Sequence, residues 1–363
     1  MNIFYDYQIF SMQKFGGISR YFYRLCKNNQ GLWDFYVQAN YLDNVYLDEI
    51  SKNKKCRIKK DFIGKSYLLD RYNKIDLFRK LLKQDFDLYH PTYYYFDKSA
   101  VSKPVVITVH DFIHELFPYY FNKDKQTIIS KKQAIHKADR IIAISQNTKK
   151  DLLNFNPDIP EDKIDVVYHA IEWIPGEKHE LSPKIVKPYI LFTGQRWLYK
   201  NFILFSKSVA PLLKKYDLHL ICTGCDFTQQ EKQHLENLSI AERTFSIFAD
   251  ENQLKALYEN ALCFVFPSLY EGFGFPILEA FASNCPIAIS NTSCFPEIAD
   301  DAALYFDPHS EREICKTVEI LITSESLRKQ LVKKGSQRFG LFSMENFIKN
   351  TYNVYTKSIE TKR

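Results

Sequence analysis

Residues 267–280 of this 363-residue chain read PSLYEGFGFPILEA. The short apolar run that ends at Pro267 predicts a buried strand at Cys263–Pro267. A loop with two glycines follows it, and Pro276 then begins an expected helix at Pro276–Ser283. The start of such a helix presents free backbone N–H groups and the positive end of the helix dipole, which together favour a bound anion. The segment therefore predicts an α/β unit with an anion site at a strand end.

Two acids and two glycines of this segment are candidates for ligand binding. Glu271 lies on the expected loop and Glu279 about one turn into the expected helix, so both carboxylates can point toward one ligand. Gly272 and Gly274 allow the backbone to approach that ligand closely. The alternative is an ordinary strand, loop and helix with two surface acids, and the segment alone leaves it open.

Short apolar runs alternate with longer amphipathic stretches along the chain, which is typical of parallel α/β sheets. The other strands that we expect are Asn2–Asp6, Phe35–Ala39, Leu88–His90, Val105–His110, Arg140–Ser145, Tyr189–Thr193, Leu218–Thr223 and Ile287–Ser290. The main helices that we expect between them are Ser19–Lys27, Ile75–Lys83, Lys125–Ala138, Gln146–Asn154 and Phe202–Lys215.

Length and pattern predict two domains. A chain of 363 residues fits about 150 residues per domain, and the pattern lapses into Pro, Glu, Lys and His at residues 173–188. We therefore expect an amino-terminal domain at residues 1–172, a hinge at 173–188 and a carboxy-terminal domain at 189–342. A final amphipathic helix at residues 343–363 is expected to pack back across the hinge.

Composition excludes several classes of protein. An apolar share of 45% and a charged share of 25% are ordinary for globular proteins, which excludes a disordered chain, a collagen-like repeat and a small disulfide scaffold. No uninterrupted apolar run reaches about 18 residues, and the first residues, MNIFYD, do not resemble a secretion signal. We expect a cytoplasmic protein whose eight cysteines are reduced thiols.

The positive charge lies in the first part of the chain. The net charge is +6, but residues 1–150 carry 26 Lys and Arg against 15 Asp and Glu, and Lys52–Lys60 alone holds six of these cations. Such a run attracts anionic lipid headgroups or an anionic acceptor, although a solvated loop is an equal alternative. No nucleic-acid-binding motif accompanies it, so we expect no nucleic-acid partner.

Two further loops resemble phosphate-binding turns. Residues 189–201 read YILFTGQRWLYKN, in which a strand ends at Gly194 and the cations Arg196 and Lys200 follow four residues apart. Arg binds phosphate through two hydrogen bonds and Lys as a point charge, although both can also lie on a solvated loop. Near the amino terminus, Gly16 and Gly17 open a helix after the first strand, either as a plain turn or as a loop against phosphate or sugar.

A histidine ends the fourth expected strand, in the sequence TVHD at residues 108–111. Ligands of parallel sheets bind at such ends, so His110 is a candidate site residue, with a structural histidine as the alternative. The neighbouring acids do not form a HExxH metal motif. Asp85 and Asp87 resemble the DxD of metal-dependent sugar transferases, but they precede a strand, so we expect no metal.

With these motifs in place, the chain resembles the retaining glycosyltransferases of family 4, and among them the O-antigen and lipopolysaccharide mannosyl- or rhamnosyl-transferases. The resemblance covers about residues 1–340. It is carried by the Glu271 and Glu279 pair, Gly194-x-Arg196-x3-Lys200-Asn201, Gly16-Gly17, His110-Asp111, Ile142–Ser145 and Ser293–Ile298. It implies the α/β GT-B fold, in which two Rossmann-like domains with parallel sheets face each other across a cleft.

The resemblance also implies a role for each matched residue of the second domain. Glu279 would hold the ribose hydroxyls of the nucleotide and Glu271 the hydroxyls of the donor sugar. Arg196 and Lys200 would bind the diphosphate beside Gly194 and offset charge on the leaving nucleotide. The backbone N–H groups beside sugar and phosphate would come from Phe273, Gly274 and Phe275.

In the first domain, the resemblance implies that His110 contacts the donor sugar and that Gly16 and Gly17 border phosphate and acceptor. The family requires no metal or other cofactor. Because one carboxylate is assigned to ribose, the two-carboxylate scheme of glycosidases does not apply. The favoured scheme is attack on the face from which the nucleotide leaves, with the departing phosphate oxygen taking the acceptor's proton.

The activity implied is transfer of a hexosyl unit, with retention, from a nucleotide-diphosphate sugar to a hydroxyl of a growing lipid-linked or lipopolysaccharide O-antigen glycan. GDP-mannose is the preferred donor, with dTDP-rhamnose and UDP-sugars open. The basic first domain predicts peripheral contact with the anionic inner face of the cell membrane. Two alternatives are a nucleotide-sugar epimerase or hydrolase of the same fold, and a non-catalytic subunit that binds nucleotide sugars.

Overall fold

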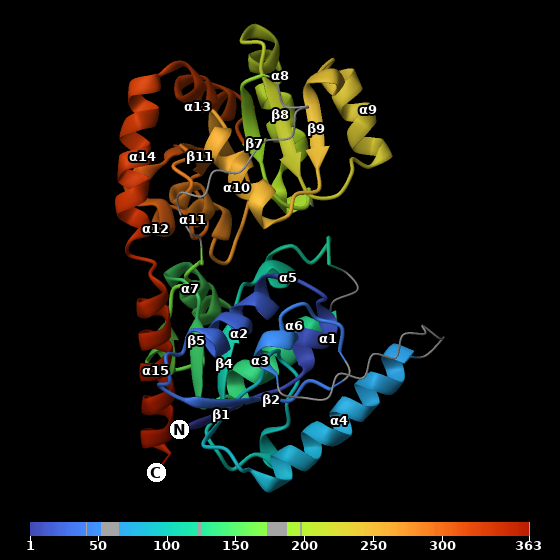
Figure 1. Cartoon of the computed structure of the whole chain (residues 1–363), viewed down its shortest axis with the longest axis vertical. Helices are drawn as coiled ribbons and strands as arrows, with labels where there is room; N and C mark the ends of the chain where they lie inside the picture. Colours follow the sequence, from blue (N-terminus) through green and yellow to red (C-terminus); the bar gives the residue numbers. More distant parts are fainter. Residues whose placement is uncertain (41, 52–64, 122–124, 173–186, 197, 363) are drawn as a thin grey trace. The chain divides into compact units, whose positions relative to one another are not determined.

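The computed structural model describes residues 1–40, 42–51, 65–121, 125–172, 187–196 and 198–362. It forms two compact units, an amino-terminal unit of residues 1–169 with 344–363, and a carboxy-terminal unit of residues 170–343 (Figure 1). The basic run Lys52–Lys60 and all but the last two residues of the expected hinge lie outside the described residues. In the described part of the chain, no helix has the length and apolar character needed to cross a membrane.

The amino-terminal unit contains two three-stranded parallel sheets, in the orders β2-β1-β3 and β4-β5-β6. A parallel bridge between Tyr89 and Val105 connects the start of β4 to β3, so the strands follow one another in the order β2-β1-β3-β4-β5-β6. The strands are β1 (Asn2–Tyr5), β2 (Asp34–Val37), β3 (Leu88–His90), β4 (Val106–Val109), β5 (Arg140–Ala143) and β6 (Ile164–Val166). The helices are α1 (Gln8–Met12), α2 (Gly17–Lys27), α3 (Leu47–Ile50), α4 (Lys65–Lys83), α5 (Ile113–Leu116), α6 (Lys125–Lys137) and α7 (Gln146–Phe155).

The carboxy-terminal unit contains one six-stranded parallel sheet in the order β12-β11-β10-β7-β8-β9. The strands are β7 (Tyr189–Phe192), β8 (His219–Thr223), β9 (Thr244–Ile247), β10 (Cys263–Phe266), β11 (Ile287–Ser290) and β12 (Leu304–Phe306). The helices are α8 (Phe202–Lys215), α9 (Gln229–Asn237), α10 (Glu251–Asn260), α11 (Phe275–Ala282), α12 (Phe295–Ala299), α13 (Glu311–Thr323) and α14 (Glu325–Phe339).

The order of the second sheet reverses direction between β7 and β10, which lie side by side at its centre. The chain builds β8 and β9 on one side of β7 and then crosses to build β10, β11 and β12 on the other. Loops that leave these two central strands at their carboxyl ends diverge from each other. In open α/β sheets this is where ligands bind.

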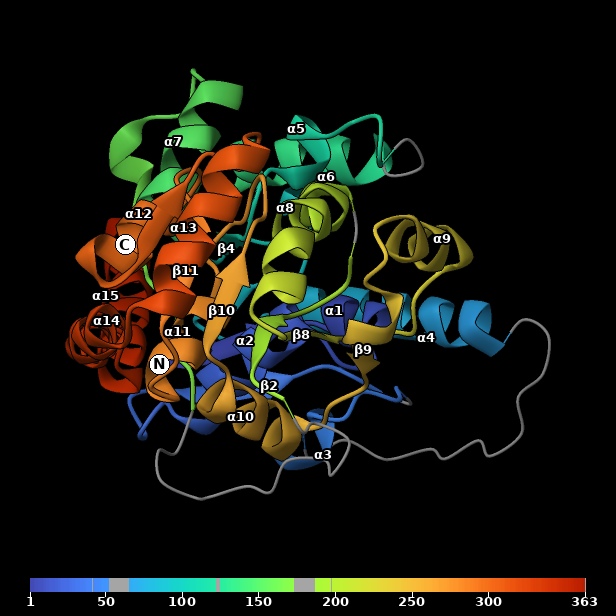
Figure 2. The same cartoon turned by 90° about the horizontal axis from the view of Figure 1, so that it is seen from above.

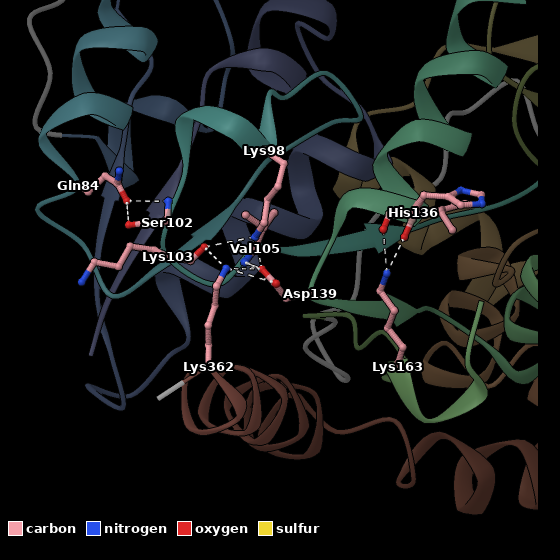
Figure 3. Close-up of polar contacts among 10 residues, drawn as sticks. Gln84, Lys98, Ser102, Lys103, Val105, His136, Asp139, Lys163 and Lys362 are labelled. Carbon is pink, nitrogen blue, oxygen red and sulfur yellow. Dashed lines mark hydrogen bonds and ion pairs between the residues drawn. The ribbon is translucent and has the colours of Figure 1, made fainter. Parts of the chain in front are cut away.

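The last helix, α15 (Met344–Thr361), belongs to the amino-terminal unit. Its fully buried Tyr355 shares a hydrogen bond of 3.0 Å with the hydroxyl of Tyr5 and one of 2.7 Å with Nδ1 of His90. Just beyond the helix, Lys362 donates to the carbonyl of Lys103 at 3.0 Å and contacts the Asp139 carboxylate at 3.2 Å (Figure 3). Buried hydrogen bonds and a charged contact therefore fix the end of the chain on this unit.

Candidate functional site

A lysine and a glutamate from two loops form an ion pair at the centre of the carboxy-terminal sheet. Lys200 ends a short 3-10 turn after β7, and its Nζ lies 2.5 Å from Oε1 of Glu271, on the loop after β10. The two side chains are only 14% and 16% exposed. The Lys200 ammonium also lies 5.2 Å from the ring centroid of Phe266, the last residue of β10. The structure thus brings together two residues that the sequence motifs singled out separately.

The backbone of Glu271 is held by the loop after β11. Its N–H donates to Oγ of Ser293 at 3.0 Å, and the Ser293 hydroxyl donates to the Glu271 carbonyl at 2.5 Å. Ser293 has a φ of +60°, an uncommon conformation for a serine. Ser293 opens one of the family motifs, but no role for it could be predicted from the sequence. Its contacts identify it as the residue that positions Glu271.

The helix after Glu271 begins at a glycine in a left-handed conformation. Gly274 has a φ of +88° and precedes α11, whose first turn contains Pro276. A side chain at position 274 would also meet Cδ1 of Ile277 at 3.2 Å. The backbone at Phe273, Gly274 and Phe275 therefore lies at the amino-terminal end of an apolar helix, where the helix dipole favours an anion.

Glu279 is half-buried on α11 and accepts a hydrogen bond of 3.2 Å from the hydroxyl of Tyr258, on α10. The same hydroxyl lies 3.2 Å from Oγ1 of Thr193, which follows β7 directly. Tyr258 is fully buried, and burial followed by the charge of Glu279 raises its pKa well above the usual value. Tyr258 is a second positioning residue that the sequence analysis missed, because nothing in its local sequence points to Glu279.

Gly194 lies where β7 and β8 end side by side. Its φ is +95°, and its N–H donates to Oγ1 of Thr223 at 3.2 Å. A side chain on the neighbouring Gly224 would come within 3.1 Å of the Gly194 carbonyl. Gly224 therefore allows the two loops to approach closely, whereas Gly194 is favoured by its left-handed backbone.

Arg196 is placed differently from the expectation of a cation exposed to phosphate. Its side chain is 4% exposed, and its Nε lies 2.9 Å from Oε1 of Glu231, on α9. Its Nη2 donates to the carbonyls of Cys225 and Asp226 at 2.5 and 3.0 Å, and the guanidinium lies over the ring of Phe227. In this structure Arg196 ties the loop after β8 to its own loop. Its buried Nη1 has no hydrogen-bond partner among the described residues.

His110, in the amino-terminal unit, directly follows β4 and is buried, with an 8% exposed residue surface. Burial lowers the pKa of His110 to about 4, so the imidazole is neutral at pH 7. Its ring contacts the edge of Tyr21 at 5.2 Å and stacks on His169 at 6.0 Å. A buried lysine, Lys131, donates to the carbonyl of Asp111 at 2.9 Å and thereby supports the turn that carries His110.

Gly16 and Gly17 lie at the start of α2 in the same unit. Gly16 precedes the helix, and the side chain of Gln13 folds back so that its Oε1 accepts from the N–H of Ser19 at 3.1 Å. A side chain at position 16 would collide with Gln13, whereas one at position 17 would meet nothing within 4 Å. The space beside the Cα of Gly17, where a side chain would lie, is therefore open.

Asp87 has a structural contact, since its carboxylate accepts from the backbone N–H of Asn2 at 2.8 Å. Across the described ranges, no group of three His, Cys, Asp or Glu side chains is placed to hold a metal ion.

The two units are both α/β with parallel sheets, and they define a two-domain Rossmann-like protein of the GT-B fold. In each unit the candidate residues lie at the carboxyl ends of strands or at helix starts. The chain belongs to the glycosyltransferases of this fold. Residues 15–172 match the model described as Glycosyltransferase Family 4, and residues 177–338 match the model described as Glycosyl transferases group 1.

The chain is similar in sequence to two curated glycosyltransferases and in fold to a solved structure. The chain is 30% identical over 207 residues to the O-antigen chain mannosyltransferase RfbU of Salmonella typhimurium, and spans 57% of that relative's length. It is 28% identical over 289 residues, 74% of either chain, to the O-antigen chain mannosyltransferase B of Escherichia coli. Among solved structures, sucrose-phosphate synthase from Thermosynechococcus elongatus superposes with a TM-score of 0.75 over 99% of this chain and all of its own, at 13% identity.

Proposed function

We propose that this protein transfers a hexosyl unit from a nucleotide-diphosphate sugar to a hydroxyl of a growing lipid-linked or lipopolysaccharide O-antigen glycan. GDP-mannose is the preferred donor, because two relatives of the chain are named as O-antigen mannosyltransferases. The reaction retains the anomeric configuration and needs no metal. It takes place at the cytoplasmic face of the cell membrane.

The ion pair between Lys200 and Glu271 is the observation that carries the proposal. A diphosphate at the start of α11 would meet a cation in Lys200 and the positive end of a helix dipole, so its charge is offset without a metal. Once Lys200 contacts phosphate, the Glu271 carboxylate can accept hydrogen bonds from the donor sugar. In this proposal Glu279 accepts from the ribose hydroxyls, and its hydrogen bond with Tyr258 supports that orientation.

Arg196 keeps the role of a supporting cation in this proposal. Its guanidinium fixes the loop after β8 through Glu231 and two carbonyls, and it does so from a position four residues before Lys200. His110 acts as a neutral imidazole that shapes the sugar site, since its pKa is about 4. No side chain is required as a covalent nucleophile, because the acceptor hydroxyl attacks on the face from which the nucleotide leaves. None is required as a general base either, because the departing phosphate takes the proton of that hydroxyl.

The charge of the first part of the chain supports the acceptor class. Residues 1–150 carry a surplus of eleven positive charges, which favours a surface of anionic lipid that presents a lipid-linked acceptor. We include peripheral contact of the amino-terminal unit with this surface in the proposal.

A thermal-shift panel of GDP-mannose, dTDP-rhamnose and UDP-sugars tests the donor, since a ligand that binds the folded state raises the melting temperature. GDP-mannose is expected to give the largest rise. Transfer is then measured with the best donor and a lipid-linked acceptor, and Glu271→Ala is expected to keep nucleotide binding but lose transfer. Release of free nucleotide or an epimerised sugar without acceptor would favour the epimerase or hydrolase instead. Binding without any turnover would favour the non-catalytic subunit.

A further inference from the structure

One side of helix α4 packs on the amino-terminal unit. The side chain of Asn73 is fully buried there, where its amide donates to the carbonyl of Asn40 at 3.0 Å and its Oδ1 accepts from the N–H of Asn40 at 3.1 Å. Leu81 and Leu77 continue this side into the apolar core. In both views the helix lies at the margin of the unit, away from its strands (Figure 1 and Figure 2).

The acidic side chains of α4 are engaged by the protein. Asp76 accepts hydrogen bonds from Gln38 and Asn40 at 3.1 and 3.0 Å. Asp70 accepts from the hydroxyl of Tyr7 at 3.0 Å and pairs with Lys74 at 2.7 Å. Both residues are partly buried, although 41% of the Asp70 side chain is exposed beside Lys74.

The outward side of α4 is apolar and positively charged. From Tyr67 onward, every exposed residue of the helix is either apolar, aromatic or cationic. They are Tyr67, Leu68, Arg71, Tyr72, Lys74, Ile75, Phe78, Arg79, Leu82 and Lys83. Exposure of large apolar side chains to water is unfavourable. A contiguous patch of them along a helix therefore marks an interaction surface.

We propose that the outward side of α4 docks on an anionic lipid bilayer and buries its apolar side chains at the level of the headgroups. Helices that lie in this interface combine large apolar residues with Lys and Arg, which contact anionic headgroups. A second copy of the chain fits this surface poorly, because two such helices would bring like charges together. The inference rests on the proposed function in one respect, that a lipid-linked acceptor is presented at such a bilayer.

Vesicle sedimentation tests the inference, with vesicles of phosphatidylcholine alone or mixed equally with phosphatidylglycerol. The wild-type protein is expected to bind the anionic vesicles. The variant Leu68→Gln/Ile75→Gln/Phe78→Gln/Leu82→Gln keeps good helix formers and is expected to bind at least about tenfold more weakly. Arg71→Gln/Arg79→Gln is expected to lose about fivefold for each cation removed. Phe248→Gln, at an aromatic residue of the other unit that is 78% exposed, is the matched control and should bind as wild type.

Insertion is read from a tryptophan at the surface. Tyr72→Trp is expected to shift its emission to the blue when anionic vesicles are added, whereas Phe248→Trp is expected to show no shift. Circular dichroism of each variant confirms that it is folded. Wild-type binding to the vesicles that survives loss of the four apolar residues would overturn the inference. So would a dimer in solution that those four substitutions abolish.

The two proposals fail separately. The α4 variants are expected to transfer sugar to a soluble acceptor analogue at the wild-type rate, because α4 contributes no residue to the candidate donor site. Absence of transfer by the wild-type protein would refute the proposed function and leave the vesicle result intact. Wild-type transfer without any vesicle binding would refute the inference about α4 and the peripheral membrane contact, but it would leave the proposed transfer reaction intact.

Discussion

Lys200 Nζ lies 2.5 Å from Glu271 Oε1, although 71 positions separate the two residues in the sequence. The pair joins the turn after β7 to the loop after β10, the two strands between which the order of the sheet reverses. Within the described residues, each of the two charges is paired with the other. Under the proposed function, a bound diphosphate takes over Lys200 and releases the carboxylate to the donor sugar.

Glu271→Gln is expected to lower kcat by about a hundredfold, because the amide keeps the shape of the side chain but loses the charge that is matched to the transition state. The dissociation constant of the nucleotide diphosphate should change little, since its contacts with Lys200 and α11 remain. Steady-state kinetics and calorimetric titration of the nucleotide measure the two effects. Glu259→Gln, at an exposed glutamate of α10, is the matched control. A kcat within twofold of wild type would remove Glu271 from the active site.

The pair of Arg196 and Glu231 is expected to contribute to stability. Its side chains are 4% and 11% exposed, so Glu231→Gln leaves a nearly buried guanidinium without its counter-charge. Removing one partner of such a pair typically costs about 3–5 kcal/mol, and urea unfolding followed by circular dichroism measures it. Glu325→Gln breaks an exposed pair with Lys329 and should leave the unfolding curve unchanged. Equal curves for both variants and wild type would show that Arg196 needs no counter-charge.

Acid is expected to destabilise the amino-terminal unit through its buried histidines. Burial lowers the pKa of His90 to about 3 and of His110 to about 4, against about 6.5 in an unfolded chain. Between pH 6.5 and 4 the unfolded chain binds protons that the folded chain does not. The free energy of unfolding therefore falls by about 1.4 kcal/mol per pH unit for each histidine as the pH drops through this window.

Urea unfolding between pH 7 and pH 4.5 measures this dependence. The fluorescence of Trp33 reports unfolding in a protein whose other two tryptophans are replaced by phenylalanine. Burial raises the pKa of Asp6, which acts on the pH dependence in the opposite sense. The contribution of His110 is therefore measured as the difference in pH dependence between wild type and a variant without this histidine. His110→Asn is expected to show a shallower fall than wild type. Parallel curves would mean that His110 is charged in the folded protein.

Most of the described strands could be predicted from short apolar runs in the sequence. The expected Tyr189–Thr193 and Cys263–Pro267 are β7 and β10, each within one residue of its expected end, and the expected Leu88–His90 is β3. β6, β9 and β12 were missed. The apolar run of β6 is interrupted by Asp165, whose carboxylate pairs with Arg140 of the adjacent β5 at 2.5 Å. A polar residue satisfied by a neighbouring strand leaves no apolar pattern to read.

The expected helix at Ile75–Lys83 begins ten residues earlier in the structure, at Lys65. Its first half exposes Tyr67, Leu68 and Tyr72, so its apolar residues do not follow the face that packs on the protein. Apolar residues that lie on both the packed and the exposed sides of a helix blur the single apolar stripe by which periodicity predicts it. The failure to predict this half therefore has the same physical cause as the proposed docking surface.

Motifs identified Glu271, Lys200 and Glu279 as site candidates, but not the residues that hold them. Ser293 and Tyr258 contact these side chains across turns of the fold, and a hydrogen bond between distant loops has no local sequence pattern. For the same reason the sequence could not predict that Arg196 faces Glu231. Arg196 and Lys200 lie four residues apart in the sequence, and this spacing predicted that both cations contact phosphate.

Gly274 and Gly17 are expected to be needed for different reasons, the first for the backbone conformation and the second for space beside a substrate. Gly274→Ala places a side chain at a φ of +88° and within 3.2 Å of Ile277, so we expect it to lower the free energy of unfolding by about 1–2 kcal/mol. Gly17→Ala meets nothing within 4 Å at the start of α2 and should leave stability unchanged or slightly higher. If donor or acceptor occupies the open space beside Gly17, as proposed, the same methyl group raises KM for that substrate. Thermal unfolding and steady-state kinetics of both variants separate these effects, and a Gly17→Ala protein with wild-type KM for both substrates would remove Gly17 from the site.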